Sequence, residues 1–415
     1  MQTETIDPQI TSNADDAVAA AAASGERVIL FALWLLVFSS SSQLMIVVAM
    51  LPAIGEQLSI STDRQGLLVS SYAVMVGVFA LVAGPISDKI GRRRMLLAGS
   101  GLMTAALALH AVAGSYAMLL AARTIAGVAG GALSGVVVAY VGDYFPYARR
   151  GWANGWVMSG IAAGQIAGVP LGAVLAEHFG FRTPFLFFAA TMGATFLLVL
   201  KFVPQPHVKL DERKLTVGGA IAEYLKFLKQ KDILAAASVF ALLFLSVALY
   251  ITYLPAWLTA YRGATPNRIA ALFFVGGIAS VMTGPIVGKL SDKAGRKPLI
   301  LASSLGLVIL MSGSTYFIQE FWLAFPVFFL SSVLLAARMS PFQALLSALV
   351  SGERRGALMS LTVALGQIGF AAGAALAGII YAQFDYRTGT FAGAIIALIA
   401  AALVWRRLPE PVVQK

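Results

Sequence analysis

The sequence has no cysteine and few charged residues. The absence of cysteine excludes disulfides and thiolate metal sites. His110, His178 and His207 are too far apart in the sequence to suggest a metal cluster, and no motif predicts a cofactor. Charged residues make up 12% of the chain and hydrophobic residues 59%, whereas soluble domains carry about 25% charged residues. We therefore expect much of the surface to face lipid.

Acidic residues are absent from the middle of every long apolar segment. All 19 Asp and Glu residues fall in tails, loops or segment ends. A buried organic cation needs a counter-charge in a medium of low dielectric constant, so their absence favours a neutral or anionic solute. The proton carrier also stays unassigned. Asp143, at the inner end of the fourth segment, is the nearest candidate, although pairing with Arg92 or Arg149 is the stronger interpretation.

Enzyme and ATPase signatures are missing as well. The sequence shows no paired carboxylates, no His cluster and no Gly-x-x-x-x-Gly-Lys-Ser/Thr loop. We therefore expect neither an enzyme nor a nucleotide-driven pump.

Twelve apolar runs are long enough to cross a bilayer, which takes about 20 residues of helix. They predict an all-α membrane protein of twelve transmembrane helices in two six-helix bundles. The runs lie near residues 28–53, 66–87, 95–114, 116–141, 152–176, 184–203, 234–259, 268–288, 299–318, 322–348, 357–382 and 390–405. The expected units are a disordered cytoplasmic tail (1–27), an N-terminal bundle (28–203), a cytoplasmic linker (204–232), a C-terminal bundle (233–408) and a second tail (409–415).

The distribution of basic residues predicts the orientation. With both termini inside, only five of the 30 Lys and Arg residues are external, in agreement with the positive-inside rule. The five are Arg64, Arg182, Arg262, Arg268 and Arg387. We expect a multi-pass protein of a bacterial inner membrane, acting as a monomer without nucleic acid. The basic segment 204–232 is either an amphipathic surface helix around residues 221–228 or a solvated linker.

The two halves of the chain repeat each other. Residues 84–93 recur as 288–297 with six of ten identical, at an offset of 204. Arg-Arg-Gly at 149–151 recurs at 354–356, and the triplet at 181–183 recurs at 386–388, both at an offset of 205. The chain is therefore a duplicated six-helix unit. Arg123 and Arg338 end similar Leu-Leu-Ala-Ala-Arg strings, but their offset of 215 is out of register, so we treat them as independent.

Three of these motifs resemble those of the major facilitator superfamily. The loop at 84–94 is similar to its signature loop, residues 123–127 to a second motif, and residues 164–172 to the antiporter motif of the twelve-helix drug:proton exporters. Val169 separates Gly168 from Pro170, which is similar to the sugar- and nucleoside-efflux members. The resemblance implies a secondary transporter that works by alternating access and exports a drug, sugar or metabolite in exchange for protons, with the solute between the halves. An uptake symporter and a transporter-like membrane sensor are the alternatives.

The signature loop and its repeat are candidates for a cytoplasmic gate. A short charged turn between helices can form ion pairs with neighbouring helix ends, and the resemblance implies that these pairs close the inner gate. The alternative is that the charges only fix the topology. The candidate gate residues are Gly84, Asp88, Gly91, Arg92, Arg93, Arg149, Gly288, Asp292 and Arg296.

Glycines recur every four residues on the fifth segment, at Gly160, Gly164, Gly168 and Gly172. They leave one helix face nearly free of side chains, so a neighbouring helix can come close. Pro170 removes a hydrogen bond and favours a bend. We interpret this face as a rocking surface between the halves, with static packing as the alternative.

Two arginines and a glutamine are the candidates for solute binding or coupling. Arg123 lies about seven residues below the outer boundary, roughly 10 Å deep, where a charge usually faces a cavity or a partner; the alternative is snorkelling to the interface. Arg338 and Gln43 are the other cavity candidates. Tyr253 and Trp257, near the outer end of the seventh segment, are interpreted first as residues of the aromatic belt.

Overall fold

The computed structural model describes residues 8–206, 208, 210, 224–348 and 355–408. Twelve helical segments among them are long and apolar enough to cross a membrane, which confirms the predicted number of spans. The elements are α1 (Pro8–Gln57), α2 (Thr62–Ile90), α3 (Arg92–Ala111), α4 (Tyr116–Leu133), α5 (Val136–Tyr144), α6 (Tyr147–Ala163), η1 (Gly164–Gly168), α7 (Val169–Phe179), α8 (Arg182–Phe202), α10 (Lys231–Ile251), α11 (Leu254–Arg262), α12 (Pro266–Ala294), α13 (Arg296–Phe317), η2 (Phe321–Leu323), α14 (Ala324–Ala348), α15 (Arg355–Gln383) and α16 (Tyr386–Arg407).

Some spans are built from two or three consecutive elements. The fourth span breaks between α4 and α5 at Gly135, whose φ of 78° is open to glycine without strain. The fifth span changes from α6 to the π-helix η1 and then to α7, which has Pro170 in its first turn. Because Pro170 has no amide hydrogen, the regular helical pattern cannot continue through it unchanged. This change of helix type turns the side chains of η1 relative to a continuous α-helix.

The first helix begins earlier than expected. The sequence predicted a disordered tail over residues 1–27, whereas the backbone is already helical from Pro8. The segment contains the run Ala19–Ala23, and alanine has the highest helix propensity of all residues. Pairing of Glu26 with Arg149 at 2.8 Å connects the start of the span to α6.

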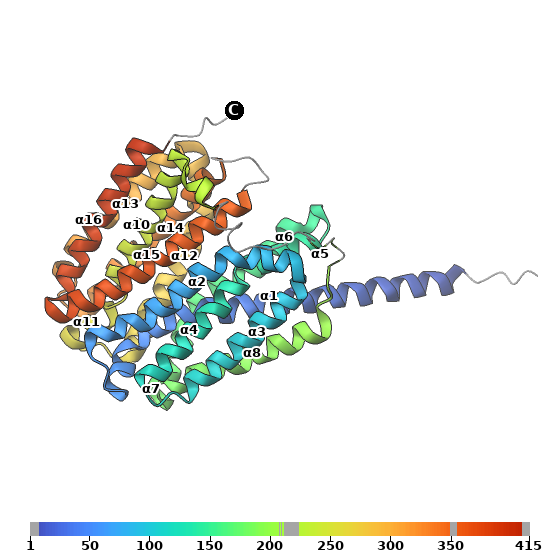
Figure 1. Cartoon of the computed structure of the whole chain (residues 1–415), viewed down its shortest axis with the longest axis horizontal. Coiled ribbons are helices and arrows are strands. Elements are labelled where there is room, and N and C mark those ends of the chain that lie inside the picture. The colour runs from blue at the N-terminus through green and yellow to red at the C-terminus, as the bar shows by residue number, and fades with distance from the viewer. Residues whose placement is uncertain (1–7, 207, 209, 211–223, 349–354, 409–415) are drawn as a thin grey trace, which may run out of the picture.

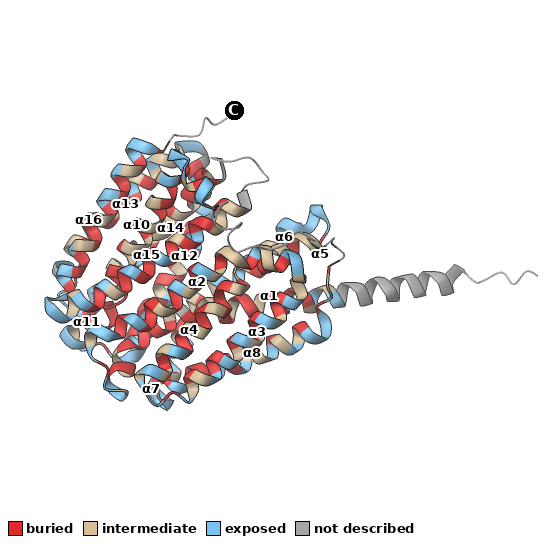
Figure 2. Ribbon diagram, in the orientation of Figure 1, coloured by how far each residue is buried: buried red, intermediate tan, exposed pale blue. Residues whose placement is uncertain are grey.

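The two bundles lie side by side, with α2 against α15 and α12 against η1 and α7 (Figure 1). We call the end with the α2–α3 loop the Asp88 end, and the opposite end, with the α10–α11 break, the Tyr253 end. Figure 1 shows the bundles together at the Tyr253 end, near the labels α7 and α11, and diverging toward α5, α6 and the C-terminus. Buried residues gather on the helix faces that meet within and between the bundles (Figure 2).

Small residues allow α2 and α15 to approach closely. A Cβ added to Gly77 would lie 2.8 Å from the carbonyl oxygen of Ala364 across the interface. The hydroxyl of Ser70 donates to the carbonyl of Ala371 at 2.6 Å. The contact therefore combines close backbone packing with a hydrogen bond between the halves, as expected for membrane helices.

The described part of the linker returns to this interface. Residues 224–228 are helical, while residues 221–223 of the expected amphipathic helix lie outside the described residues. Phe227 is buried with Leu358 and Leu361 of α15, next to Leu81 of α2. The hydroxyl of Tyr224 donates to the carbonyl of Leu81 at 3.0 Å. Over this stretch the linker packs against both bundles at the Asp88 end.

Candidate functional site

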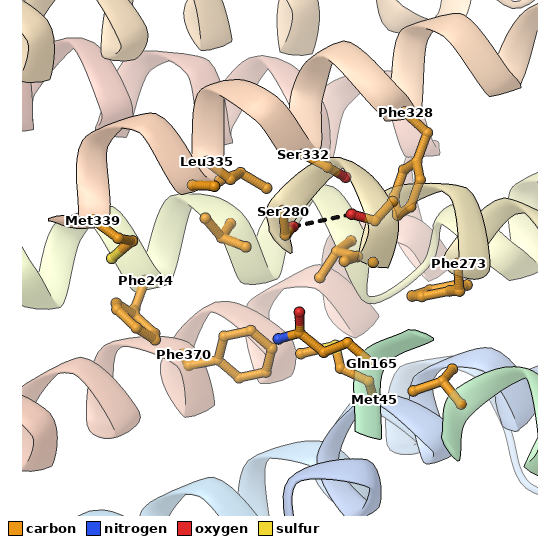
Figure 3. Close-up of a pocket in the computed structure, with 16 residues that line it drawn as sticks. Met45, Gln165, Phe244, Phe273, Ser280, Phe328, Ser332, Leu335, Met339 and Phe370 are labelled. Carbon is orange, nitrogen blue, oxygen red and sulfur yellow. Dashed lines mark hydrogen bonds between the residues drawn. The ribbon is translucent and has the colours of Figure 1, made fainter. Parts of the chain in front are cut away.

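A cavity of about 330 Å³ lies between the bundles. Its volume falls at the small end of the range of ligand pockets. Only three of the 16 lining residues come from the N-terminal bundle (Figure 3). The lining consists of Met45, Gln165, Val169, Phe244, Val247, Ile251, Phe273, Gly276, Gly277, Ser280, Phe328, Ser332, Leu335, Ala336, Met339 and Phe370. Most of these side chains are apolar, so the cavity suits a solute with an apolar body.

Gln165 is the longest polar side chain in the cavity. It comes from η1, and Figure 3 shows its amide beside Phe370, directed toward the cavity. The other polar groups are the hydroxyls of Ser280, which donates to the Gly276 carbonyl at 3.0 Å, and Ser332. Gln165 falls within the predicted fifth span, 152–176, but the sequence favoured Gln43 as the cavity residue. The π-helix that turns Gln165 toward the cavity was not visible in the sequence pattern.

Arg123 is completely buried inside the N-terminal bundle, so the snorkelling alternative was wrong. Its Nε donates to the Leu68 carbonyl at 3.0 Å and its Nη1 to the Gln43 carbonyl at 3.2 Å. The guanidinium carbon also lies 4.3 Å from the centre of the Tyr72 ring, a distance typical of a cation–π interaction. Arg123 thus connects α1, α2 and α4, and it does not line the cavity in this conformation.

Gln43 does not line the cavity either. Its side chain is fully buried, and neither amide atom has a hydrogen-bond partner among the described residues. The contact between Gln43 and Arg123 runs through the Gln43 backbone. The structure therefore brings Gln43 and Arg123 together, as two of the predicted site residues, beside Met45 of the cavity lining.

Arg338 is the second fully buried arginine. Its Nη2 donates to the carbonyl of Leu243 at 3.3 Å, while Nε and Nη1 have no hydrogen-bond partner within the described part of the chain. It does not line the cavity, but Leu335 and Met339 on the same helix do. At an offset of 205, Arg338 corresponds to Leu133 and Arg123 to Phe328, in agreement with treating the two arginines as independent.

The signature loop forms a network of ion pairs at the Asp88 end. Arg92 lies 2.5 Å from the carboxylate of Asp88 and 2.7 Å from that of Asp143, and its Nη1 donates to Ser87 at 3.1 Å. Asp143 is therefore a partner of Arg92, as the sequence suggested. Gly91 between the helices has a φ of 97°, a value that only glycine adopts without strain.

The neighbouring gate candidates hold helix ends. Arg93 donates to the carbonyls of Val203 and Leu200 at 2.8 and 2.7 Å, at the end of α8. Arg149 pairs with Glu26 rather than with Asp143. Gly84 has open space where a Cβ would lie, so close packing does not require glycine there.

The repeated loop at the end of α12 has a similar shape, and its basic residues also donate to backbone carbonyls at helix ends. Gly295 has a φ of 90°, close to that of Gly91. Arg296 donates to the Ala344 carbonyl at 2.8 Å, and Lys297 donates to the Leu408 carbonyl at 2.9 Å. Gly288 lies in α12, and a Cβ added to it would lie 3.7 Å from the hydroxyl oxygen of Ser340. The side chain of Asp292 lies outside the described residues.

The glycine face of the fifth span packs on α1, within one bundle. A Cβ on Gly160 would lie 2.8 Å from the Trp34 carbonyl oxygen. Cβ atoms on Gly164 and Gly168 would collide with the serine pair Ser41 and Ser42, and one on Gly172 with Ile46. The predicted rocking surface between the halves was therefore wrong for these glycines. The other face of the span makes that contact: Gly277 of α12 packs on Gln165 and Ile166.

Tyr253 was interpreted as a belt residue, but it joins the bundles. Its side chain is buried, and its hydroxyl donates to the Thr62 carbonyl at 2.5 Å and accepts from the Gly66 amide at 2.9 Å. A Cβ on Gly378 of α15 would lie 2.8 Å from the same oxygen. Trp257 is also buried, stacked on Tyr386. Hydropathy alone could not separate a lipid-facing ring from one that faces the other bundle.

Comparisons with known proteins agree with this architecture. The sequence model of the Major Facilitator Superfamily matches residues 33–308 and 236–415. The chain is 26% identical to the uncharacterized MFS-type transporter YceJ of Bacillus subtilis, covering 85% of this chain and 90% of YceJ. It is 24% identical to the multidrug resistance protein MdtG of Proteus mirabilis, covering 92% of this chain and 96% of MdtG.

Two solved structures share the fold. A D-xylose–proton symporter superposes with a TM-score of 0.76 at 16% identity, covering 94% of this chain and 99% of the symporter. A bacterial homologue of the human lysosomal transporter Spinster, in an inward-facing and occupied conformation, gives a TM-score of 0.73 at 16% identity, covering 92% and 96% of the two chains. At this identity the likeness extends to the fold alone.

Proposed function

The chain belongs to the Major Facilitator Superfamily of transporters, and on this premise we propose that it exports a small neutral or anionic compound in exchange for protons. The observation that carries the proposal is the charge around the cavity. Each bundle contains one fully buried arginine, Arg123 or Arg338, the cavity between the bundles is mostly apolar, and no carboxylate occurs in the middle of any span. Such a site disfavours organic cations, which need a buried negative partner. Export is supported by the relative MdtG, a multidrug resistance protein.

The arrangement of the bundles supports alternating access with the Asp88 end facing the cytoplasm. The bundles are joined at the Tyr253 end by the Tyr253 hydroxyl and by the packing of α12 on η1 and α7. They diverge toward α5 and α6 (Figure 1). The basic loops lie at the same end, as the positive-inside rule requires for the cytoplasmic side. In this orientation the conformation is open to the cytoplasm, and both termini are cytoplasmic.

In this mechanism the two ends close in turn. Opening the Tyr253 end requires loss of the Tyr253 hydrogen bonds and separation of α12 from Gln165. Closing the Asp88 end brings the ion-paired loop of Asp88, Arg92 and Asp143 toward the other bundle. Arg123 contributes by holding α1, α2 and α4 together through the Leu68 and Gln43 carbonyls. We assign it the role of keeping the bundle rigid while the proton and the solute exchange.

Transport by the purified full-length chain tests this function. The protein is placed in liposomes with an imposed pH gradient, and uptake is measured for an aromatic carboxylate (2-naphthoate), its neutral amide and an aromatic amine cation of similar size. We expect uptake of the carboxylate or the amide that depends on the pH gradient and stops when a protonophore removes it. Protein-free liposomes are the control. Uptake of the cation alone, or uptake independent of the gradient, would contradict the proposal.

A further inference from the structure

Arg338 is a buried cation whose hydrogen-bonding capacity is mostly unused. It is fully buried and makes a single hydrogen bond, at the long distance of 3.3 Å, to the Leu243 carbonyl. Nε and Nη1 have no acceptor among the described residues, and none of the ion pairs found there includes it. A buried charge without a partner is strongly destabilising. A charged side chain within a membrane span commonly marks a solute pathway.

The surroundings of Arg338 place it at the wall of the cavity. On α14 it lies between Leu335, three residues before it, and Met339, directly after it, and both line the cavity. Its acceptor Leu243 on α10 directly precedes the cavity residue Phe244. Figure 3 shows Met339 and Phe244 together at one end of the cavity. The guanidinium therefore lies between α10 and α14, beside that end.

The part of α14 next to Arg338 is able to rearrange. Met339 has an unbranched, flexible side chain that adopts other rotamers at low cost. Pro341, three residues after Arg338, lies inside α14 and has no amide hydrogen, so the helix is weakened next to the arginine. Contact between a solute and Arg338 therefore requires only that the side chains next to it on α14 rearrange, and Met339 is one of these. An acidic group there would supply the missing charge and accept charge-assisted hydrogen bonds.

The rest of the cavity defines the body of such a ligand. Phe244, Phe328 and Phe370 supply aromatic walls, and the volume is about 330 Å³. The amide of Gln165 offers one polar contact in the cavity. We propose that Arg338 binds the acidic group of the solute, and that the cavity takes an aromatic organic monoanion with this group at the Phe244 end. The inference rests on the proposed function only in taking the cavity as the solute site.

Equilibrium binding to the full-length protein in lipid nanodiscs tests the assignment without requiring transport. The probes are 2-naphthoate and its neutral isostere 2-naphthamide, titrated calorimetrically at neutral pH. For the wild-type protein we expect the carboxylate to bind about tenfold more tightly than the amide, which corresponds to about 1.4 kcal/mol. In Arg338→Gln we expect the two affinities to become equal through loss of carboxylate affinity. Arg338→Lys should keep part of the preference, because it retains the charge.

Two further variants separate charge from shape and from folding. Phe328→Leu, which trims the aromatic wall, should weaken both probes by a similar factor. Arg268→Gln, which removes an exposed cation that is not part of the cavity lining and lies over the rings of Phe321 and Trp322, should leave the preference unchanged. If Arg338→Gln elutes as an aggregate, the comparison is made with Arg338→Lys and wild type alone, and an undiminished preference in that variant overturns the assignment.

The outcomes distinguish this inference from the proposed function. Equal affinities for the two probes in the wild-type protein, no binding of 2-naphthoate, or an intact preference in Arg338→Gln would each overturn the role of Arg338. A pH-driven flux of a neutral compound would leave the exporter proposal standing in those cases. Conversely, a carboxylate preference that depends on Arg338 without any flux driven by a pH gradient would support this site and contradict proton-coupled export.

Discussion

The two bundles share a framework but carry different charges at corresponding positions. Arg93 and Lys297 both donate to the residue that directly follows the sixth helix of their own half, Val203 and Leu408. The contacts described for Arg92 and Arg296 differ in one respect. Arg92 pairs with the carboxylate of Asp143, whereas Arg296 donates to a backbone carbonyl, and the residue that corresponds to Asp143 at an offset of 205 is Ala348.

The buried arginines show the same divergence inside the bundles. Arg123 has two carbonyl acceptors and an aromatic ring from two other helices, so it holds its bundle together. Arg338 has one weak acceptor and lies next to cavity residues. Thirteen of the 16 cavity residues belong to the C-terminal bundle. The comparison indicates that the two halves keep a common scaffold, whereas the cavity is lined mainly by the C-terminal bundle, which is the part that we propose binds the solute.

The largest expected effect distinguishes the two arginines. Arg123→Ala should reduce the flux of every solute by about 100-fold or more. The substitution leaves the Leu68 and Gln43 carbonyls without their buried donor, and it removes the contact that joins α1, α2 and α4. Arg123→Lys should restore little of the flux, since a single ammonium group cannot replace a planar guanidinium that donates to both carbonyls. Arg338→Ala should instead keep the flux of a neutral solute. Uptake into liposomes checks both. Wild-type-like flux in Arg123→Ala would remove it from the mechanism.

The second effect concerns the gate. Asp88→Asn should insert normally but reduce flux by about tenfold, because its pair with Arg92 loses its charge and the loop no longer closes the cytoplasmic side. Asp232→Asn is the matched control at the same end of the molecule. This aspartate is exposed in the first turn of α10 and makes none of the ion pairs found among the described residues. Flux is measured at equal protein levels. Full transport by Asp88→Asn would mean that the loop charges only fix the topology.

A third variant tests how the bundles are joined. Tyr253→Phe removes two hydrogen bonds between the bundles, each worth about 1 kcal/mol net. We expect a shift of about fivefold or more toward the conformation open at the Tyr253 end. Because the chain has no cysteine, spin labels can be attached at Glu56→Cys and Tyr261→Cys, exposed positions in the two halves. Pulsed spin-resonance distances between them report the shift.

The matched control for Tyr253 is a tyrosine three residues earlier. The hydroxyl of Tyr250 shares a hydrogen bond with Ser331 of its own bundle. Tyr250→Phe therefore removes a buried hydroxyl without touching the contact between the halves. The distance distribution of the spin-labelled Tyr250→Phe variant should match that of the spin-labelled protein in which Tyr250 and Tyr253 are both present, which is the background for this test. Identical distributions for Tyr253→Phe and that background would show that the hydroxyl does not contribute to closing this end.

The sequence predicted what hydropathy and internal repetition determine. The number of spans, the two related halves and the pairing of Asp143 with one of two arginines, Arg92 or Arg149, follow from apolar length, offset and charge, and the structure shows Arg92. It did not determine which way each helix face points. A helix that is apolar all round gives no periodic signal for its orientation, so the glycine face of the fifth span was assigned to the other half although it packs on α1.

Local changes in helix geometry account for the other differences. The π-helix η1 turns Gln165 toward the cavity, and the break between α10 and α11 places Tyr253 against α2. The orientation of Gln165 depends on the shift of helical register in η1, and the position of Tyr253 depends on a hydrogen bond between segments far apart in the chain. Neither feature can be predicted from residue spacing alone. The residues that sequence reasoning missed therefore lie where a helix departs from regular geometry.

The smallest expected effect compares the starts of the sixth helix in each half. Asp385 caps α16 by accepting from the Thr388 amide at 2.6 Å, whereas α8 follows Gly180 and Phe181 without a side-chain cap. Asp385→Ala should cost about 0.5 to 1 kcal/mol and lower the thermal midpoint by on the order of 1 °C.

The cap also predicts a pH dependence confined to the C-terminal half. The amide hydrogen bond from Thr388 lowers the pKa of the Asp385 carboxyl in the folded protein. The unfolded chain has the higher pKa, about 3.9, so the stabilisation is fully present above that value and is lost as the pH falls through the folded pKa. The difference in thermal midpoint between wild type and Asp385→Ala should thus be constant at neutral pH and shrink below about pH 4. A difference that grows on acidification would show that the carboxylate is not the capping group. Gly180→Ala is the control in the N-terminal half, where the residue has a φ of 84° and no side chain caps the helix. Its loss of stability should not vary with pH.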